Sequence, residues 1–174
     1  MNTLLEDVHA VLSTTPERWQ RLVSTLPIDL LTRPPAAGEW SALNCLQHLL
    51  DAERVNFPVR FRAFLAGQDF EPFDPNRAIA GSDAQTSSEL VAAFARSRQE
   101  SLVLLSSVKD DDLGRTVQHP TFGTVTLAQM LHTWAAHDLM HTVQAERALM
   151  QPFMLACGPW RAFFRDHEIG VPKE

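Results

Sequence analysis

Three histidines stand close together in segment 132–144, HTWAAHDLMHTVQ. On a helical wheel of about 100° per residue, His137 and His141 lie one turn apart, at the edge of the apolar arc. Such an i, i+4 pair brings two imidazoles within reach of one ion at about 2.1 Å. His132 lies about 140° from His137, on the solvent side, and cannot share that ion. His137 and His141 are therefore candidate metal ligands. The alternative is a polar pair hydrogen-bonded at the rim of the core.

A further histidine, His48, lies in the middle of segment 40–53, WSALNCLQHLLDAE. It shares a helical face with Cys45, Ala52 and Val55, which indicates a buried face of small residues. A lone histidine on such a face is more often a hydrogen-bonded core group. Opposite a histidine pair on a second helix, it would complete three neutral imidazoles with an open fourth position. That is the arrangement of a catalytic rather than a structural zinc site.

Residues around the histidine pair have two interpretations each. Asp138 falls inside the apolar arc, and a buried carboxylate needs a partner. That partner is either the free ring N–H of a metal ligand from another helix or an arginine. Gln144 shares the face of His137, where it touches a metal-bound water or substrate, or is an ordinary surface glutamine. Trp40 and Trp134 are expected as core residues or pocket walls.

Few other side chains suggest catalysis. The candidate general bases are Asp51, Glu53 and Asp138, and the sequence places none of them firmly. Cys45 precedes His48 by about one turn on the same side of the helix. We interpret it as a small buried hydrophobe rather than a nucleophile or fourth ligand.

The elements that must position these residues are helical. Four segments have helical periodicity: about 3–26, Ser41 to 66, 83–108, and Thr124 or Thr126 to Met150. Pro16 predicts either two collinear pieces or one kinked helix in the first segment, and Pro58 predicts a kink in the second. Residues 110–123 are expected to be irregular, no segment alternates like a strand, and a short helical tail is expected around 160–167. These segments therefore predict that residues 1–174 form a single-domain four-helix bundle. The long loop 67–82 is a candidate crossover connection.

Composition excludes several classes of protein. The 174 residues carry 15 basic and 21 acidic side chains, for a net charge of −6. This balance argues against a nucleic-acid-binding module and against docking on an anionic membrane. The sequence has no apolar run of about 20 residues and begins with acidic residues rather than a signal peptide. With two cysteines outside any CxxC motif, we expect a cytoplasmic protein.

The two histidine segments also carry a family resemblance. GEWSALNCLQHLLDAE (38–53) and FGTVTLAQMLHTWAAHDLMHTVQ (122–144) resemble the second- and fourth-helix signatures of the DinB-like, YfiT-related metalloenzymes, and GPWRAFFRDH (158–167) is similar to that family's C-terminal tail. The resemblance implies a four-helix bundle with a crossover connection. It also implies a zinc or nickel ion held by His48, His137 and His141, and a homodimer formed through bundle helices.

The resemblance also implies classes of activity. The family includes S-transferases and isomerases that use a low-molecular-weight thiol, and metal-dependent hydrolases. We expect a divalent-metal-dependent enzyme acting on a small molecule, with a thiol-dependent transferase slightly favoured over a hydrolase by family precedent. The alternative is a non-catalytic, metal-stabilised bundle that binds a small molecule or serves in a stress response. Pro58 departs from the family pattern, because it follows the second-helix motif unusually closely and would reshape the pocket mouth.

Overall fold

The computed structural model describes residues 3–70 and 86–170 of the 174-residue chain. Its elements, in chain order, are the helices α1 (Thr3–Thr25), α2 (Ile28–Thr32), α3 (Ala42–Val55), α4 (Phe57–Ala66) and α5 (Ser87–Leu105), the 3₁₀ helix η2 (Asp110–Gly114), the strands β1 (Thr116–His119) and β2 (Gly123–Thr126), the helix α6 (Leu127–Ala156) and the 3₁₀ helix η3 (Gly158–His167). The chain is mostly helical, as the sequence predicts.

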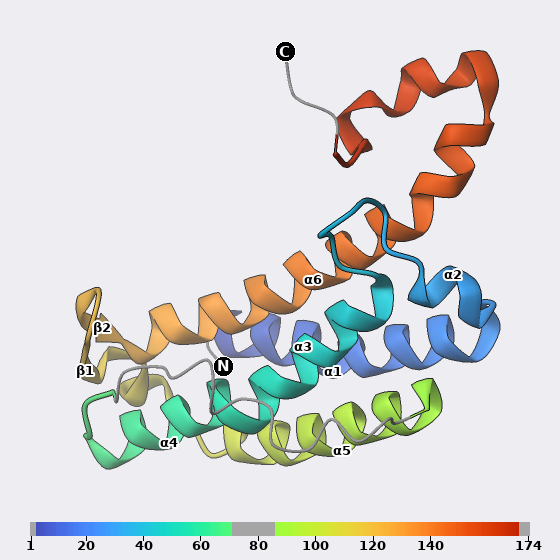
Figure 1. Cartoon of the computed structure of the whole chain (residues 1–174). Helices are drawn as coiled ribbons and strands as arrows, with labels where there is room; N and C mark the ends of the chain where they lie inside the picture. The colour runs from blue at the N-terminus through green and yellow to red at the C-terminus, as the bar shows by residue number, and fades with distance from the viewer. Residues whose placement is uncertain (1–2, 71–85, 171–174) are drawn as a thin grey trace.

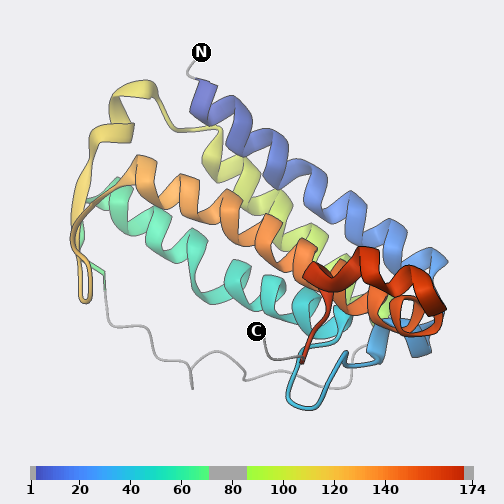
Figure 2. The ribbon, with the colours of Figure 1, turned by 90° about the horizontal axis from the view of Figure 1, so that it is seen from above.

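Four rods form the bundle: α1, the consecutive helices α3 and α4, α5, and α6 (Figures 1 and 2). Helix α1 packs against α5 and α6, and α3 packs against the same two helices, so α1 and α3 are diagonal neighbours. Helices α4 and α5 run in the same direction, opposite to α1 and α6 (Figure 1). Parallel successive helices require a crossover connection, which confirms the predicted topology. The candidate crossover loop 67–82 lies mostly outside the described residues.

Pro16 and Pro58 have different effects on the helices in which they lie. Helix α1 continues through Pro16 as one helix, although proline has no N–H to donate to the carbonyl of Leu12. The helical conformation is interrupted between α3 and α4 at Asn56, where φ is −119° and ψ is −84°. Pro58 then occupies the first turn of α4. The predicted kink is therefore a helix break. It turns the start of α4 without separating it from α6, which it still contacts.

A two-stranded hairpin corrects the prediction for residues 110–123. Strands β1 and β2 pair antiparallel, with Val117 opposite Val125, and Val117 is buried. The N–H of Phe70 donates to the carbonyl of Gln118 at 3.0 Å, which ties the end of α4 to the hairpin. The prediction that no strand occurs was wrong. Strands of four residues are too short to show a convincing alternation.

Helix α6 begins at one of its two predicted starts and ends later than predicted. Thr126 caps it in a capping box with Gln129, which satisfies otherwise unpaired N–H groups of the first turn. The helix continues past Met150 to Ala156, with Pro152 inside it. Its last turns and η3 stand away from the four packed helices (Figure 1), and η3 has no buried residue. The predicted tail therefore lies outside the bundle. None of the helices described here is long and apolar enough to span a membrane.

The bundle core is divided by a layer of polar side chains. Buried apolar residues form two clusters, one that includes Leu12 and Trp134 and one that includes Trp19 and Ala145. Between them lies Arg98, whose side chain is 1% exposed. A buried guanidinium is tolerated only when its charge and its donors are satisfied.

Arg98 joins all four rods. It donates to Glu53 of α3 through Nε at 3.0 Å and Nη2 at 2.7 Å. Its Nη1 and Nη2 donate to the two carboxylate oxygens of Asp138 on α6. Its Nη1 also donates, at 3.0 Å, to the carbonyl of Leu12 on α1, the carbonyl that Pro16 leaves without its helical partner. Arg98 therefore supplies the hydrogen bond that Pro16 cannot donate.

The carboxylate of Glu53 is also fully used. Ser101 donates to it at 2.6 Å, and the indole N–H of Trp134 donates at 3.0 Å. Sequence reasoning missed Arg98, although it lies four residues after Phe94 and three before Ser101, on the buried side of α5. That position in the apolar periodicity was the signal.

Replacement of Arg98 by methionine is expected to destabilise the protein by about 3–5 kcal/mol, because it leaves two buried carboxylates without their cation. The measurement is urea unfolding followed by circular dichroism. The exposed Arg96 on the same helix is the matched control, and Arg96→Met should change the unfolding free energy by less than about 0.5 kcal/mol. Equal effects of the two substitutions would contradict the role given to Arg98.

Candidate metal centre

His48, His137 and His141 come together on the outer side of the contact between α3 and α6. The Nε2 atoms of His48 and His137 are 3.1 Å apart. One ring nitrogen from each histidine can be chosen so that all three lie within 4.8 Å of one another. His132, also on α6, is exposed and is not part of the cluster. The structure thus brings together the three histidines named from the sequence and leaves out the one that was rejected.

Two of the three nitrogens already have the spacing that a single metal ion requires. Tetrahedral ligands at about 2.05 Å from zinc lie about 3.3 Å from one another, close to the separation of the His48 and His137 nitrogens. Nε2 of His141 is buried and has no hydrogen-bond partner among the residues that the structure describes. An unpaired buried nitrogen is costly in a protein interior, and coordination of an ion would satisfy it. The donor set is therefore suited to a divalent ion that imidazole binds, such as zinc or nickel.

The surroundings keep these histidines neutral. Burial lowers the pKa of His137 to about 3, with further contributions from the nearby His141, His48 and Arg98. Burial also lowers the pKa of His48, helped by His141. It lowers the pKa of His141 too, against opposing effects of Gln144 and Asp138. Metal ligation requires neutral imidazole, so the site is prepared for an ion rather than for protons.

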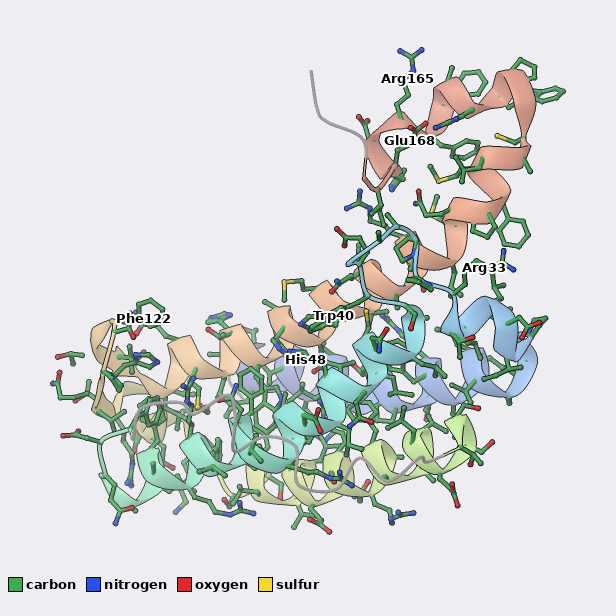
Figure 3. All side chains as sticks on the ribbon, viewed as in Figure 1. Arg33, Trp40, His48, Phe122, Arg165 and Glu168 are labelled. Atoms are coloured by element: carbon green, nitrogen blue, oxygen red, sulfur yellow. The ribbon has the colours of Figure 1, made fainter. Side chains whose placement is uncertain are left out.

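Aromatic rings enclose the histidines. The Trp40 ring is stacked on His141, with centroids 5.8 Å apart, and lies 5.0 Å from the His48 ring; Figure 3 shows Trp40 beside His48. The Phe57 ring lies edge-on to His137 at 5.1 Å. Trp40 is 39% exposed, so it is the solvent-side wall of the site. Trp134, in contrast, is a buried core residue stacked on Phe57.

A turn places Trp40 over the site. The N–H of Glu39 donates to the carbonyl of Ala36 at 3.1 Å, and Gly38 within this turn has φ of 82°. Only glycine adopts that backbone region without strain. The turn is followed by Ser41, whose side chain caps α3 in a capping box with Asn44. Trp40 is thus held between a turn and a helix start.

Gln144 has a different contact from those predicted. Its Oε1 lies 2.9 Å from Nδ1 of His141. An amide oxygen can only accept, so Nδ1 carries the proton and Nε2 presents its lone pair to the cluster. Gln144 therefore orients a candidate ligand, and its contact with a metal-bound water or substrate stays a prediction. The i, i+3 spacing brings the residues together, but spacing alone does not say which atoms meet.

Two of the three candidate bases are already engaged in ion pairs with an arginine. Glu53 and Asp138 both bind Arg98, so the arginine alternative for Asp138 is confirmed and no hydrogen bond joins it to a histidine ring. Asp51 is half-buried, and its Oδ1 accepts one hydrogen bond, from Gln47 at 2.9 Å. Burial raises the pKa of Asp51, although Gln47 and Arg54 oppose the shift. Asp51 is therefore the member of this set that remains available to take a proton.

Cys45 is fully buried and is not among the ligand-type side chains that cluster in the described residues. Burial raises the pKa of its thiol to about 11, against a backbone hydrogen bond that lowers it. A thiol with so high a pKa is a poor nucleophile at neutral pH. The structure therefore agrees with its interpretation as a small core residue.

Comparison with known proteins identifies the class to which this fold and site belong. The sequence profile of the DinB superfamily matches residues 12–145, which include all three clustered histidines. The chain belongs to the DinB superfamily.

Individual relatives agree with this assignment. The chain is 24% identical over 130 residues to proteins of Bacillus cereus and Bacillus anthracis that carry the name “Putative metal-dependent hydrolase”, with 73% of this chain and 75% of the relatives covered. Among solved structures it resembles YfiT from Bacillus subtilis, described as “a probable metal-dependent hydrolase with an unusual four-helix bundle topology”. That match has a TM-score of 0.73 at 20% identity and covers 88% of this chain and 89% of YfiT, which shows a shared fold.

Replacement of Gln144 by alanine is expected to weaken metal binding by about 10–100-fold, because it removes the acceptor that orients His141. Affinity is measured by competition with a chelating indicator. Gln144→Glu keeps an acceptor oxygen and should keep the affinity, and Gln99→Ala, at an exposed glutamine of α5, should have no effect. Unchanged affinity in Gln144→Ala would contradict the orienting role.

The metal-free protein is expected to lose stability as the pH falls below about 6.5. The lowered pKa of His137 means that, below that pH, the unfolded chain binds a proton there that the folded protein does not. The free energy of unfolding therefore falls with pH until the folded pKa is reached.

Denaturant unfolding at several pH values between about 7.5 and 5 measures this dependence. His137→Gln should make the loss shallower, whereas His132→Gln, at an exposed histidine of the same helix, should not. Equal slopes for the wild type and His137→Gln would contradict the assignment.

Proposed function

We propose that this protein is a divalent-metal-dependent hydrolase of a small molecule, with His48, His137 and His141 as the metal ligands. The observation that carries the proposal is the convergence of three neutral imidazoles, with the buried Nε2 of His141 lacking a hydrogen-bond partner within residues 3–70 and 86–170. The name of the curated relatives supports the reaction class. Three protein ligands leave a coordination position free for water or substrate, as in catalytic zinc sites.

Each nearby residue then has a part in the reaction. When bound, the ion supplies Lewis acidity to a water molecule or to the carbonyl group of a substrate. Trp40 and Phe57 cover the histidines and exclude bulk water from the reacting groups. Asp51, one turn after His48 on α3, is the candidate acceptor of the proton from the attacking water by its position on the helix, and its one described hydrogen bond is with Gln47. Hydrolysis breaks one acyl C–O or C–N bond, and the water supplies OH to the acid and H to the leaving group.

The alternatives remain testable. A thiol-dependent transferase would use the same ligands, and a non-catalytic binder would need the ion only for stability. Screening the metal-loaded protein against esters and amides, and separately against low-molecular-weight thiols with electrophiles, distinguishes the three. Turnover only in the thiol assays would favour the transferase, and no turnover in either would favour the binder. Zinc or nickel as the ion, a homodimer and a cytoplasmic location stay predictions.

Substitution of His48 by alanine is expected to abolish stoichiometric metal binding, because only two ligands of the three remain. Metal content after dialysis is measured by elemental mass spectrometry, and hydrolytic activity should fall with it. The matched control is His132→Ala on the exposed face of α6, which should keep the metal. Circular dichroism checks that both variants fold. Full metal content in His48→Ala would overturn the three-histidine site.

A further inference from the structure

A groove with a volume of about 340 Å³ lies beyond the metal centre, toward the end of α6. One wall is the segment Arg33–Pro35, and the other comprises the last turns of α6, including Ala148, Pro152 and Leu155. We call it the Arg33 groove. Its volume is within the usual range for small-molecule sites, about 300–1,000 Å³. Its lining is mainly apolar, as is usual for sites that hold the body of an organic ligand.

The Arg33 groove and the metal centre lie on the same side of α6. Ala148 comes seven residues after His141, which on a helix is a rotation of about −20° and a rise of about 10.5 Å. One segment of chain contributes to both sites, because Pro34 and Pro35 line the groove and Trp40, a few residues later, stacks on His141. Figure 3 shows Arg33 farther toward the end of α6 than Trp40 and His48.

The groove contains one charged residue, Arg33. Its side chain is exposed and makes no ion pair with any of the residues that the structure describes. The other large polar residue in the lining, Gln151, is committed, since its amide donates to the carbonyls of Arg147 and His167. The groove therefore presents an apolar surface with one available cation, which is complementary to an apolar molecule that carries a carboxylate.

We propose that the Arg33 groove binds the non-reacting part of the substrate, and that this part is an apolar chain ending in a carboxylate. The scissile ester or amide bond would then lie about 10 Å from the groove, at the histidines. The position of the scissile bond rests on the proposed hydrolase function, whereas binding in the groove does not. Remote binding of this kind holds the reacting bond in position at the catalytic centre.

The binding test compares octanoate with 1-octanol, which share an apolar chain and differ in charge. Both are titrated into the full-length protein, zinc-loaded and metal-free, and amide chemical shifts are followed by NMR. The expected result is perturbation at Arg33, Ala148 and Leu155 in both forms, with tighter binding of octanoate. Perturbation confined to the histidines, or absent at these residues, would overturn the proposal.

Variants separate charge from apolar contact. Arg33→Gln should weaken octanoate binding by roughly three- to fivefold and leave 1-octanol unchanged, and Arg33→Lys should retain most of the affinity for octanoate. Leu155→Ala should weaken both ligands. The control is Leu139→Ala, at another exposed leucine of α6 outside the groove, which should weaken neither. Equal effects of Arg33→Gln on the two ligands would contradict the role of its charge.

Hydrolysis of two matched esters links the groove to the reaction. Mono-4-nitrophenyl suberate and 4-nitrophenyl octanoate have equal acyl chains, and only the first ends in a carboxylate. The proposal expects a lower KM for the suberate, and loss of this preference in Arg33→Gln. If both esters are hydrolysed without preference, the groove proposal fails and the hydrolase stands. If octanoate binds in the groove as expected but neither ester is hydrolysed, the groove stands and the hydrolase does not.

Discussion

The rest of the structure depends on one interaction, the pair of buried salt bridges that Arg98 makes in the middle of the bundle. Its guanidinium lies between the carboxylates of Glu53 and Asp138. Charges separated from their partners in a protein interior cost several kcal/mol each, so these three residues resist any sliding of α3, α5 and α6 past one another. Glu53 lies five residues after His48, and Asp138 directly follows His137. The same contacts that hold the helices therefore fix the height at which His48 faces the histidines of α6.

The buried charges also bear on the metal centre. Two carboxylates and one guanidinium leave a formal charge of −1 beside three imidazoles that burial keeps neutral, with a pKa of about 3 for His137. The carboxylate of Asp138 favours positive charge at His141, where it acts to raise the pKa. Arg98 itself disfavours a proton on His137. The layer thus acts in opposite senses on the two histidines of α6, and burial is the main reason that the ligand set is free of protons.

Helical spacing predicted much of this site, because it fixes the face on which a side chain lies. It identified His137 and His141, rejected His132, and placed Asp138 inside the core with an arginine as one of two partners. It did not identify Arg98, since the partner of a buried carboxylate comes from another helix and depends on packing. The contact of Gln144 with His141 depends on side-chain rotamers, and the hairpin strands are too short to give a periodic signal. The sequence therefore predicted the helix face on which each side chain lies better than the residue with which that side chain makes its hydrogen bond or ion pair.

The segment from Arg33 to Trp40 contributes to both the groove and the metal centre. Arg33 and two prolines line the groove, and the turn at Gly38 leads directly to the ring that covers His141. Proline limits the freedom of the chain at one end, and the capping box at Ser41 fixes the other. The segment is therefore short and anchored at both ends, and Trp40 is its only aromatic residue. This shared segment is the structural link on which the proposal of one substrate-binding surface rests.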